Sequence, residues 1–374
     1  MEQVSDAVAE AYANRKAGSF AYGISNAAVA LHRRATYFND KGVGNKTGNT
    51  YTVNGHGIMY GKTNQEDFAG FEGNVDSTVN LLYTFDEQNN LTGAIVNIGC
   101  PSQCTELTTF TSADYWNETR EKIRAKHGNI YILPQCSAAG DLSPHRLNGK
   151  ESFLRIARLK YEITEHAKKF GEKYIHEYFN RKYIAEKIAY AFDECLEWAA
   201  KEKFSDAPIV HVTKTVPLEA WKVSDAEYEQ AKKDYALLKE TPFLNTEDPY
   251  ADFKENTRLS SQLQRCESVI ARYEKGEDFR DTEFHVLKIG ELAFTSCPFE
   301  LYLDFQHRIQ ARSPFAQTVM VQLCAGVTDT KGYLATKRGQ ANKGYSAIMY
   351  SCSVSPEGGQ TLVEETLKEL NKIK

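Results

Sequence analysis

The sequence predicts an α/β fold with a mixed β-sheet core, flanking helices and a peripheral pair of helices. Short apolar runs rich in β-branched and aromatic residues alternate with segments of helical periodicity. Two pairs of these runs are joined by turn-rich segments, which is typical of antiparallel hairpins. Residues 224–275 are helical and highly charged, which favours a position outside the core. A chain of 374 residues is long enough to bury a large core.

The first half of the chain is predicted to contribute one hairpin, further strands and three helical segments. Residues 2–15 place their apolar side chains on one helical face, and the helix ends near Gly18. Residues 39–73 are rich in Gly, Asn and Thr and are predicted to form a long loop. The other predicted elements are strands at 20–22, 79–85, 93–98 and 130–133, a helix to His127 capped by Ser112 or Asp114, and a helical region at 151–204 interrupted near Gly171.

The second half is predicted to contain the peripheral helices and the second hairpin. A capping box formed by Ser224 and Glu227 starts a charged helix that ends near Glu240. The turn Gly290-Glu291 joins the strands of the clearest hairpin in the chain. The other predicted elements are strands at 209–212, 284–289, 292–296 and 318–323, a loop at 241–253, and helices at 259–274, before Arg312 and after Gly359.

Composition excludes several classes of partner. The net charge is −5 and the Lys and Arg residues are scattered, so nucleic acid is not an expected partner. No apolar run approaches the roughly 18 residues of a transmembrane segment, and the N-terminus lacks a signal-peptide pattern. Most of the eight cysteines lie in apolar runs and are predicted to be buried free thiols. Cys100 and Cys104 are close together, but no second close pair completes a zinc ribbon.

The stretch from Asn129 to His145 is the strongest candidate for a functional loop. A β-rich apolar run breaks at Pro134 into small residues that let the backbone approach another segment closely. Asp141, Ser143 and His145 follow at alternate positions, where a sheet-based site collects its ligands. The alternative is an ordinary turn in which Asp141 or Ser143 caps the next segment.

Polar residues also follow other predicted strands. Cys100 ends one strand and Glu300 follows another, while Tyr333 lies in the loop after a later strand. Together with Asp141 and Ser143, these residues offer a thiol, carboxylates, a phenol and a hydroxyl, a set that suits a metal ion activating water.

Arg33 and Arg34 end an apolar segment. They either bind an anionic ligand or pair with carboxylates, and pairing is the expected outcome.

Short motifs in common order give the chain a resemblance to a known family. It resembles the neutral (alkaline, non-lysosomal) ceramidases and their bacterial relatives, zinc amidohydrolases that cleave the amide of N-acyl sphingoid bases. The resemblance implies one α/β domain over residues 1–374, with residues 224–275 as a helical insertion. The matching motifs are Ser112-Ala-Asp-Tyr115, Ala139-Gly-Asp-Leu-Ser-Pro144, Pro298-Phe-Glu300, Arg308-Ile-Gln-Ala-Arg-Ser-Pro-Phe315, Gly332-Tyr-Leu-Ala-Thr336 and Gly344-Tyr345.

The resemblance assigns roles to individual residues. It places two of the family's four zinc ligands on Glu300 and Tyr333, and the serine implicated in catalysis on Ser143. Where the family has a His-Pro after a strand, this chain has Cys100-Pro101, and the family's other histidine lies in a segment upstream of Met1. The expected zinc ligands are therefore Cys100, Glu300 and Tyr333, and the expected catalytic residues are Ser143, Asp141 and Tyr333.

Three hypotheses remain open. The first is a Zn²⁺-dependent amidohydrolase acting on a small-molecule, lipid-derived or glycan-derived amide, secreted or periplasmic by resemblance. The second is a non-catalytic binding or structural protein on the same scaffold. In the third, residues upstream of Met1 complete the enzyme. His56 or His145 could replace a missing ligand, although both are more often ordinary loop residues. The chain closes on a helix where ceramidases continue into a β-rich domain, which favours a bacterial relative with another amide or ester substrate.

Overall fold

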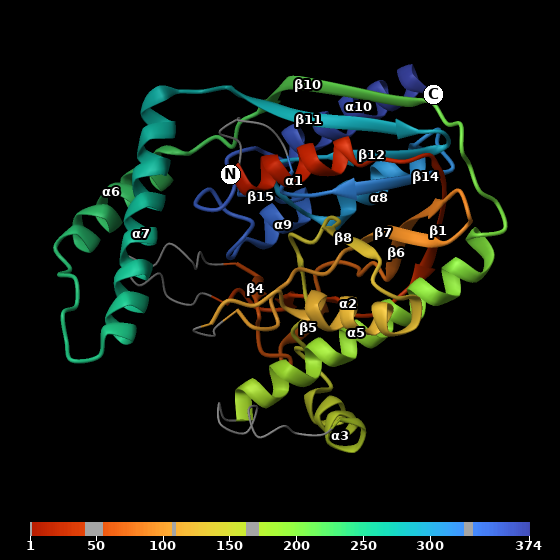
Figure 1. The fold of residues 1–374 in the computed structure, drawn as a ribbon. Helices are drawn as coiled ribbons and strands as arrows, with labels where there is room; N and C mark the ends of the chain where they lie inside the picture. Colours follow the sequence, from red (N-terminus) through yellow and green to blue (C-terminus); the bar gives the residue numbers. More distant parts are fainter. Residues whose placement is uncertain (1, 42–54, 107–109, 162–171, 325–331) are drawn as a thin grey trace.

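Two four-stranded sheets lie face to face at the centre of the fold (Figure 1). The structure is a computed structural model, and it describes residues 2–41, 55–106, 110–161, 172–324 and 332–374. Leu82 of one sheet meets Phe294 and Val319 of the other in an apolar layer between them. This layer is small, and most of the buried apolar side chains belong to a larger cluster that also includes the helices. The predicted α/β fold with a mixed β-sheet core is confirmed.

The two sheets share one pattern of strand directions. In each sheet, three antiparallel strands are followed by a fourth strand that runs parallel to the third. A helix connects the third strand to the fourth in both, as parallel neighbours require. The first sheet has the order β1 (Gly18–Asn26), β6 (Thr78–Asp86), β7 (Leu91–Ile98), β8 (Tyr131–Cys136), and the second β10 (Ile209–Glu219), β11 (Phe279–Ile289), β12 (Leu292–Ser296), β14 (Gln317–Val321).

Helices cover the outer faces of both sheets. The first sheet is covered by α2 (Tyr115–His127) and α5 (Glu172–Ala199), and the second by α8 (Leu303–Arg312) and α10 (Pro356–Ile373) (Figure 1). The Tyr83 hydroxyl donates to the Phe192 carbonyl at 2.7 Å, which ties β6 to α5. Ile188, Phe192 and Cys195 of α5 are buried on the face that meets the sheet.

A helical pair lies to one side of the sheets in Figure 1. It consists of α6 (Asp225–Lys239) and α7 (Pro249–Lys275), whose Tyr228 and Tyr273 rings stack with centroids 4.0 Å apart. The predicted capping box of Ser224 and Glu227 is present at the start of α6. The predicted loop between the helices is shorter than expected, because Asp248 caps α7 and lets the helix begin at Pro249.

One prediction is wrong in part. Within the predicted loop at 39–73, residues 57–59 and 68–71 form strands on either side of the strand Arg34–Tyr37, while residues 42–54 lie outside the described part of the chain. These strands are short and their partner is distant in sequence, so periodicity does not reveal them. The predicted break near Gly171 also falls outside the described residues. The remaining elements are α1 (Glu2–Ala13), β2 (Leu31–His32), β3 (Arg34–Tyr37), β4 (Gly57–Met59), β5 (Phe68–Phe71), β9 (Leu142–Ser143), α3 (Lys150–Lys160), β13 (Glu300–Leu301), β15 (Tyr333–Leu334) and α9 (Lys337–Asn342).

Two expectations from composition concern the whole chain. All eight cysteines are free thiols and six of them are buried, as predicted. Among the described helices, none combines the length and apolar character that a membrane crossing needs.

Candidate functional site

The loop after β8 is fastened to the segment after β12 by two buried glutamines. The Gln322 Oε1 accepts hydrogen bonds from the backbone N–H groups of Ala139 and Leu301, at 3.0 and 3.1 Å. The Gln306 Oε1 accepts from the N–H of Ala138 at 2.8 Å. Side-chain amides thus take the place of a sheet ladder where the strands end, and they bring two distant parts of the chain together.

Gly140 makes the closest approach in this region. Its N–H donates to the Leu301 carbonyl at 2.8 Å, and a Cβ at this position would lie 2.3 Å from the Glu300 carbonyl oxygen. No other residue type fits without moving β13. The close backbone approach predicted for residues 137–140 is therefore present, and the neighbouring segment carries Glu300.

Glu300 and Tyr333 lie directly opposite each other in the parallel pair β13 and β15. The Glu300 N–H donates to the Gly332 carbonyl at 2.9 Å. Gly332 has a φ of 93°, and a Cβ there would lie 2.6 Å from the Ser351 carbonyl oxygen, so the register depends on this glycine. Burial, with Glu300 nearby, raises the pKa of Tyr333 far above its ordinary value, so the phenol stays protonated and able to donate.

The guanidinium of Arg33 lies at the centre of the site. Its Nη2 donates to the Gly140 carbonyl at 2.7 Å, to the Tyr333 hydroxyl at 3.2 Å and to Glu300 Oε2 at 3.4 Å. The side chain of Arg33 is only 2% exposed, whereas that of Glu300 is 32% exposed. Burial lowers the pKa of Arg33, but nearby Tyr333 and Glu300 more than reverse this, and the group stays charged. We call Arg33, Gly140, Glu300 and Tyr333 the strand-end site.

Arg34 points to a different partner and confirms the predicted pairing. Its Nε and Nη2 bind the two carboxylate oxygens of Glu72 at 2.7 and 2.9 Å. Its Nη1 donates to the Tyr345 carbonyl at 2.7 Å, and its Nη2 also reaches the Lys343 carbonyl. Two-pronged contact with a carboxylate is the strongest ion-pair geometry available to arginine.

Asp141 acts as a helix cap. Its Oδ1 accepts from the N–H of Leu303, the first residue of α8, at 3.0 Å, and its Oδ2 lies 3.4 Å from His32 Nε2. A carboxylate at a helix N-terminus is stabilising because it meets the positive end of the helix dipole. Asp141 therefore binds the N-terminus of a helix, as the capping alternative predicted. That helix begins 162 residues later in the sequence and is not the next segment.

Ser143 is fully buried in β9 and is connected to the site through Tyr60. The Ser143 Oγ lies 3.3 Å from the Tyr60 hydroxyl and accepts from the His145 N–H at 3.1 Å. Tyr60 in turn lies close enough to Arg33 to raise its pKa. The hydroxyl of Ser143, the phenol of Tyr60 and the guanidinium of Arg33 therefore form one polar chain that leads to Glu300.

Cys100 occupies a separate environment. Its thiol is fully buried beside Cys136 and Tyr115, and the Tyr115 hydroxyl donates to the Cys100 carbonyl. Burial, followed by the proximity of Cys136, raises the pKa of the Cys100 thiol well above its ordinary value. Among the described contacts, the Cys100 thiol meets Cys136, Tyr115 and the Pro101 carbonyl rather than Glu300 or Tyr333, the other ligands expected with it.

The contacts around Glu300 and Tyr333 do not fit a bound zinc ion. The Arg33 guanidinium already contacts both groups, and a second cation at that place would meet its charge at close range. Within the described ranges, no three His, Cys, Asp or Glu residues are arranged to hold a metal. His56 binds the Tyr37 carbonyl, and His145 lies edge-on to the Tyr60 ring. The structure thus offers no support for the zinc expectation.

Two site residues were not identified as such from the sequence. Arg33 was expected to pair with a carboxylate, but its position between Glu300 and Tyr333 depends on contacts spanning 267 and 300 residues. Tyr60 was assigned to a loop. Its backbone φ is 56°, a left-handed value that is uncommon for an aromatic residue and is often found at functional positions. An arginine directly after an apolar run was the available signal for Arg33, because such a residue is drawn into the core.

Comparison with solved structures supports the ceramidase-like fold. The chain is similar to neutral ceramidase from Pseudomonas aeruginosa, with a TM-score of 0.56, 15% identity, and coverage of 99% of this chain and 55% of that chain. It is also similar to a ceramidase complexed with C2, with a TM-score of 0.54, 13% identity, and coverage of 94% and 53%. No protein-family model and no curated protein sequence matches. The chain spans about half the length of these two proteins and shares their fold.

Proposed function

We propose that this protein is a ceramidase-like hydrolase that cleaves an amide (N-acyl) bond at the strand-end site. The observation that carries the proposal is the meeting of a partly exposed carboxylate with two hydrogen-bond donors, Arg33 and Tyr333, in a fold shared with ceramidases. The substrate class is a small-molecule, lipid-derived or glycan-derived amide. Membership of the ceramidase family is part of this proposal.

The chemistry follows from the positions of these groups. Glu300 takes a proton from a water molecule, and the water oxygen attacks the amide carbonyl carbon. The Arg33 Nη2 and the Tyr333 hydroxyl donate to the oxygen that becomes negative in the tetrahedral intermediate. When the C–N bond breaks, Glu300 returns the proton to the departing amine. The products are a carboxylic acid and a free amine.

Asp141 and Ser143 are positioning residues in this proposal. Asp141 holds α8 and the loop that contains Gly140, whose carbonyl accepts from Arg33. Ser143 orients Tyr60, which lies beside Arg33. Holding a donor within a few tenths of an ångström of its working position is a large part of its catalytic value.

A second candidate function is ligand binding without turnover. The Arg33 contacts favour it, because a guanidinium that holds Glu300 restrains the carboxylate that must take up a proton. Under this alternative, the same donors bind the carbonyl of an amide ligand, and the bond stays intact.

A hydrolysis assay on the full chain tests the proposal. Purified protein is incubated with N-acyl amides that include a short-chain ceramide, with and without a chelator, and the released amine is measured. We expect turnover that survives the chelator and falls at least about 100-fold in Glu300→Gln. Glu364→Gln is the matched control, since Glu364 pairs with Arg312 on the surface. Calorimetric binding of an intact amide without turnover would support the second candidate, and neither binding nor turnover would refute both.

A further inference from the structure

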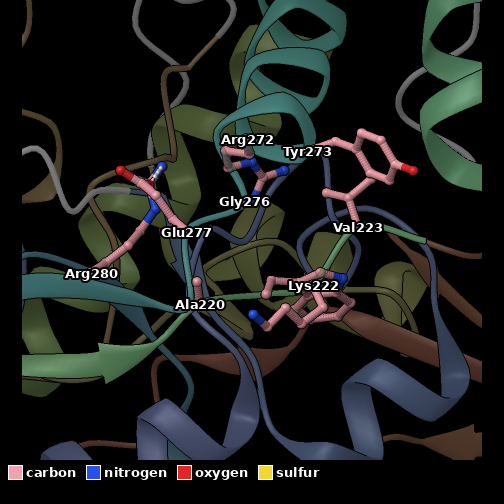
Figure 2. Close-up of a pocket in the computed structure, with 9 residues that line it drawn as sticks. Ala220, Lys222, Val223, Arg272, Tyr273, Gly276, Glu277 and Arg280 are labelled. Carbon is pink, nitrogen blue, oxygen red and sulfur yellow. Dashed lines mark ion pairs between the residues drawn. The ribbon is translucent and has the colours of Figure 1, made fainter. Parts of the chain in front are cut away.

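A second arginine-rich feature lies at the base of the peripheral helices. It is an open pocket of about 150 Å³, which is smaller than the cavities that hold drug-sized ligands. Figure 2 shows its walls, which come from the end of α7, the start of β11 and the segment after β10. We call it the α7 pocket. Its lining residues are Ala220, Trp221, Lys222, Val223, Arg272, Tyr273, Gly276, Glu277 and Arg280.

Arg272 is a largely buried cation bound to neutral groups. Its Nε and Nη1 donate to the Ser268 and Cys352 carbonyls at 3.3 and 2.8 Å, and its Nη2 donates to Met349. Across the part of the chain that the structure describes, no carboxylate forms an ion pair with Arg272. Burial, followed by repulsion from Arg280, lowers the pKa of Arg272 to about 10, so it remains charged at neutral pH. An anion in the pocket would offset the cost of this unpaired charge.

Arg280 lines the same pocket and has one donor atom without a partner among the described residues. Its Nη2 lies 3.1 Å from Glu277 Oε2, the ion pair drawn in Figure 2. Its Nε is buried and has no hydrogen-bond partner among the described residues. A buried donor of this kind calls for an explanation, although the Nε atoms of Arg33 and Arg181 also have no partner among the described residues.

The charges that line the α7 pocket do not balance. Three cations, Lys222, Arg272 and Arg280, face one carboxylate, that of Glu277. Two further charged residues, Asp278 and Lys275, lie just outside the pocket. Asp278 pairs with Lys222 and Lys275 pairs with Glu277, and the opposite charges of Asp278 and Lys275 add no net charge. Glu227 adds a further negative charge at longer range, outside the lining of the pocket.

The helix dipole explains only some of these cations. Arg272 and Lys275 lie in the last turn of α7, where positive side chains stabilise a helix. Arg280 is on β11, opposite Leu218 of β10, and the dipole does not account for its position or its free Nε. The antiparallel register and the Gly276 cap hold both arginines on rigid elements, as an anion site requires.

We propose that the α7 pocket binds a doubly charged oxyanion, in particular the phosphate group of a small phosphomonoester. Guanidinium groups present paired N–H donors that match phosphate oxygens. The excess of two positive charges among the lining residues matches a dianion. Because the pocket is open on one side, the rest of the ligand extends toward solvent, and Trp221 supplies an apolar wall.

Titration of the full chain with inorganic phosphate tests this site. Calorimetry and thermal unfolding are recorded at constant ionic strength, with sodium chloride replacing phosphate in the reference and acetate as a carboxylate arm. We expect saturable phosphate binding that weakens about tenfold or more in Arg280→Gln. Arg258→Gln is the matched control, since it removes the same charge from an exposed site on α7 outside the pocket.

Each outcome decides the proposal. Equal phosphate affinity in wild type, Arg280→Gln and Arg258→Gln would overturn it, as would the absence of saturable binding. Tighter binding of acetate than of phosphate would refute the phosphate assignment. Circular dichroism checks the fold of Arg280→Gln, and Arg280→Lys, which keeps the charge without the paired donors, should bind phosphate with intermediate affinity. Amide hydrolysis should be equal in all these variants, so failure here is distinct from failure of the proposed function.

Discussion

Arg33 of the strand-end site and its neighbour Arg34 form one pair of arginines, the α7 pocket contains another, and the pairs differ in how their charge is balanced. Arg34 is fully buried and meets Glu72 with two hydrogen bonds, and its neighbour Arg33 meets Glu300. Arg272 is also largely buried, yet its direct partners are carbonyl groups, and Arg280 lowers its pKa. A buried arginine with a carboxylate contributes to the fold, whereas one without a carboxylate is open to an anionic ligand.

One segment of backbone serves both regions. The carbonyls of Lys343 and Tyr345 accept from Arg34, and those of Met349 and Cys352 accept from Arg272. The Tyr345 ring also lies edge-on to Tyr333, with centroids 5.6 Å apart. Arginine donors on each side therefore hold residues 343–352 in place. Substitutions can test separately how each arginine's charge is balanced and how its hydrogen bonds support the backbone of residues 343–352.

The largest effect is expected for Arg34→Ala. It leaves Glu72 buried without its cation and removes the bonds to residues 343 and 345, so the free energy of unfolding should fall by about 3–5 kcal/mol. Urea unfolding followed by circular dichroism measures the loss. The double variant Arg34→Met with Glu72→Leu should recover part of it, because no unpaired charge remains. A loss under about 1 kcal/mol, the scale of an exposed ion pair, would contradict the claim that the buried pair of Arg34 and Glu72 supports the fold.

A smaller loss is expected for Gly140→Ala. The added Cβ would lie 2.3 Å from the Glu300 carbonyl oxygen, so β13 must move, at a cost of about 1–3 kcal/mol. The shift displaces Glu300 from Arg33 and should reduce amide hydrolysis or amide binding together with stability. Gly99→Ala is the comparison, since its Cβ would lie 3.2 Å from the Ala138 oxygen, a tight contact that needs a shift of only a few tenths of an ångström. Equal losses in both variants would mean that Gly140 has no special role.

High pH probes one thiol in each region, the half-buried Cys136 and the buried Cys352. Burial raises the pKa of Cys136, near Arg33, and of Cys352, near Arg272, from 9.0 to about 12. Because the folded pKa is raised, each thiol contributes stability that is fully present below pH 9 and lost as the pH rises toward 12. The expected loss is about 1 kcal/mol per thiol at pH 10. Urea unfolding at pH 7 and pH 10 measures this loss. Cys136→Ala and Cys352→Ala should each remove the part of the loss that one thiol contributes. A pH-independent unfolding midpoint in wild type would contradict this.

The sequence predicted those features that depend on neighbouring residues. The second hairpin follows from alternating apolar residues around Gly290, and the start of α6 follows from Ser224 and Glu227. The close approach of Gly140 follows from a run of small residues after a strand. Each of these signals lies within a few positions of the feature it predicts, so hydrophobic period, capping and residue size are sufficient.

The composition of the site could not be predicted in the same way. Glu300 and Tyr333 were expected together and are paired in one short ladder, but the place of Arg33 between them depends on contacts across most of the chain. Cys100 follows a strand like the other candidates, yet its thiol lies beside Cys136 and Tyr115 and, among the described contacts, meets neither Glu300 nor Tyr333. The sequence indicates that a residue follows a strand, but not which way its side chain points.

The smallest effect is expected for Arg280→Gln. It removes the ion pair with Glu277 and also the repulsion that lowers the pKa of Arg272, so the two changes largely cancel. The free energy of unfolding should stay within about 0.5 kcal/mol of wild type in phosphate-free buffer, in contrast to the Arg34 variant. Adding phosphate should then stabilise wild type by mass action and leave Arg280→Gln nearly unchanged. Thermal unfolding in matched buffers measures both. A loss as large as that of Arg34→Ala would show that Arg280 supports the fold in the same way as Arg34, and the distinction between the two regions would fail.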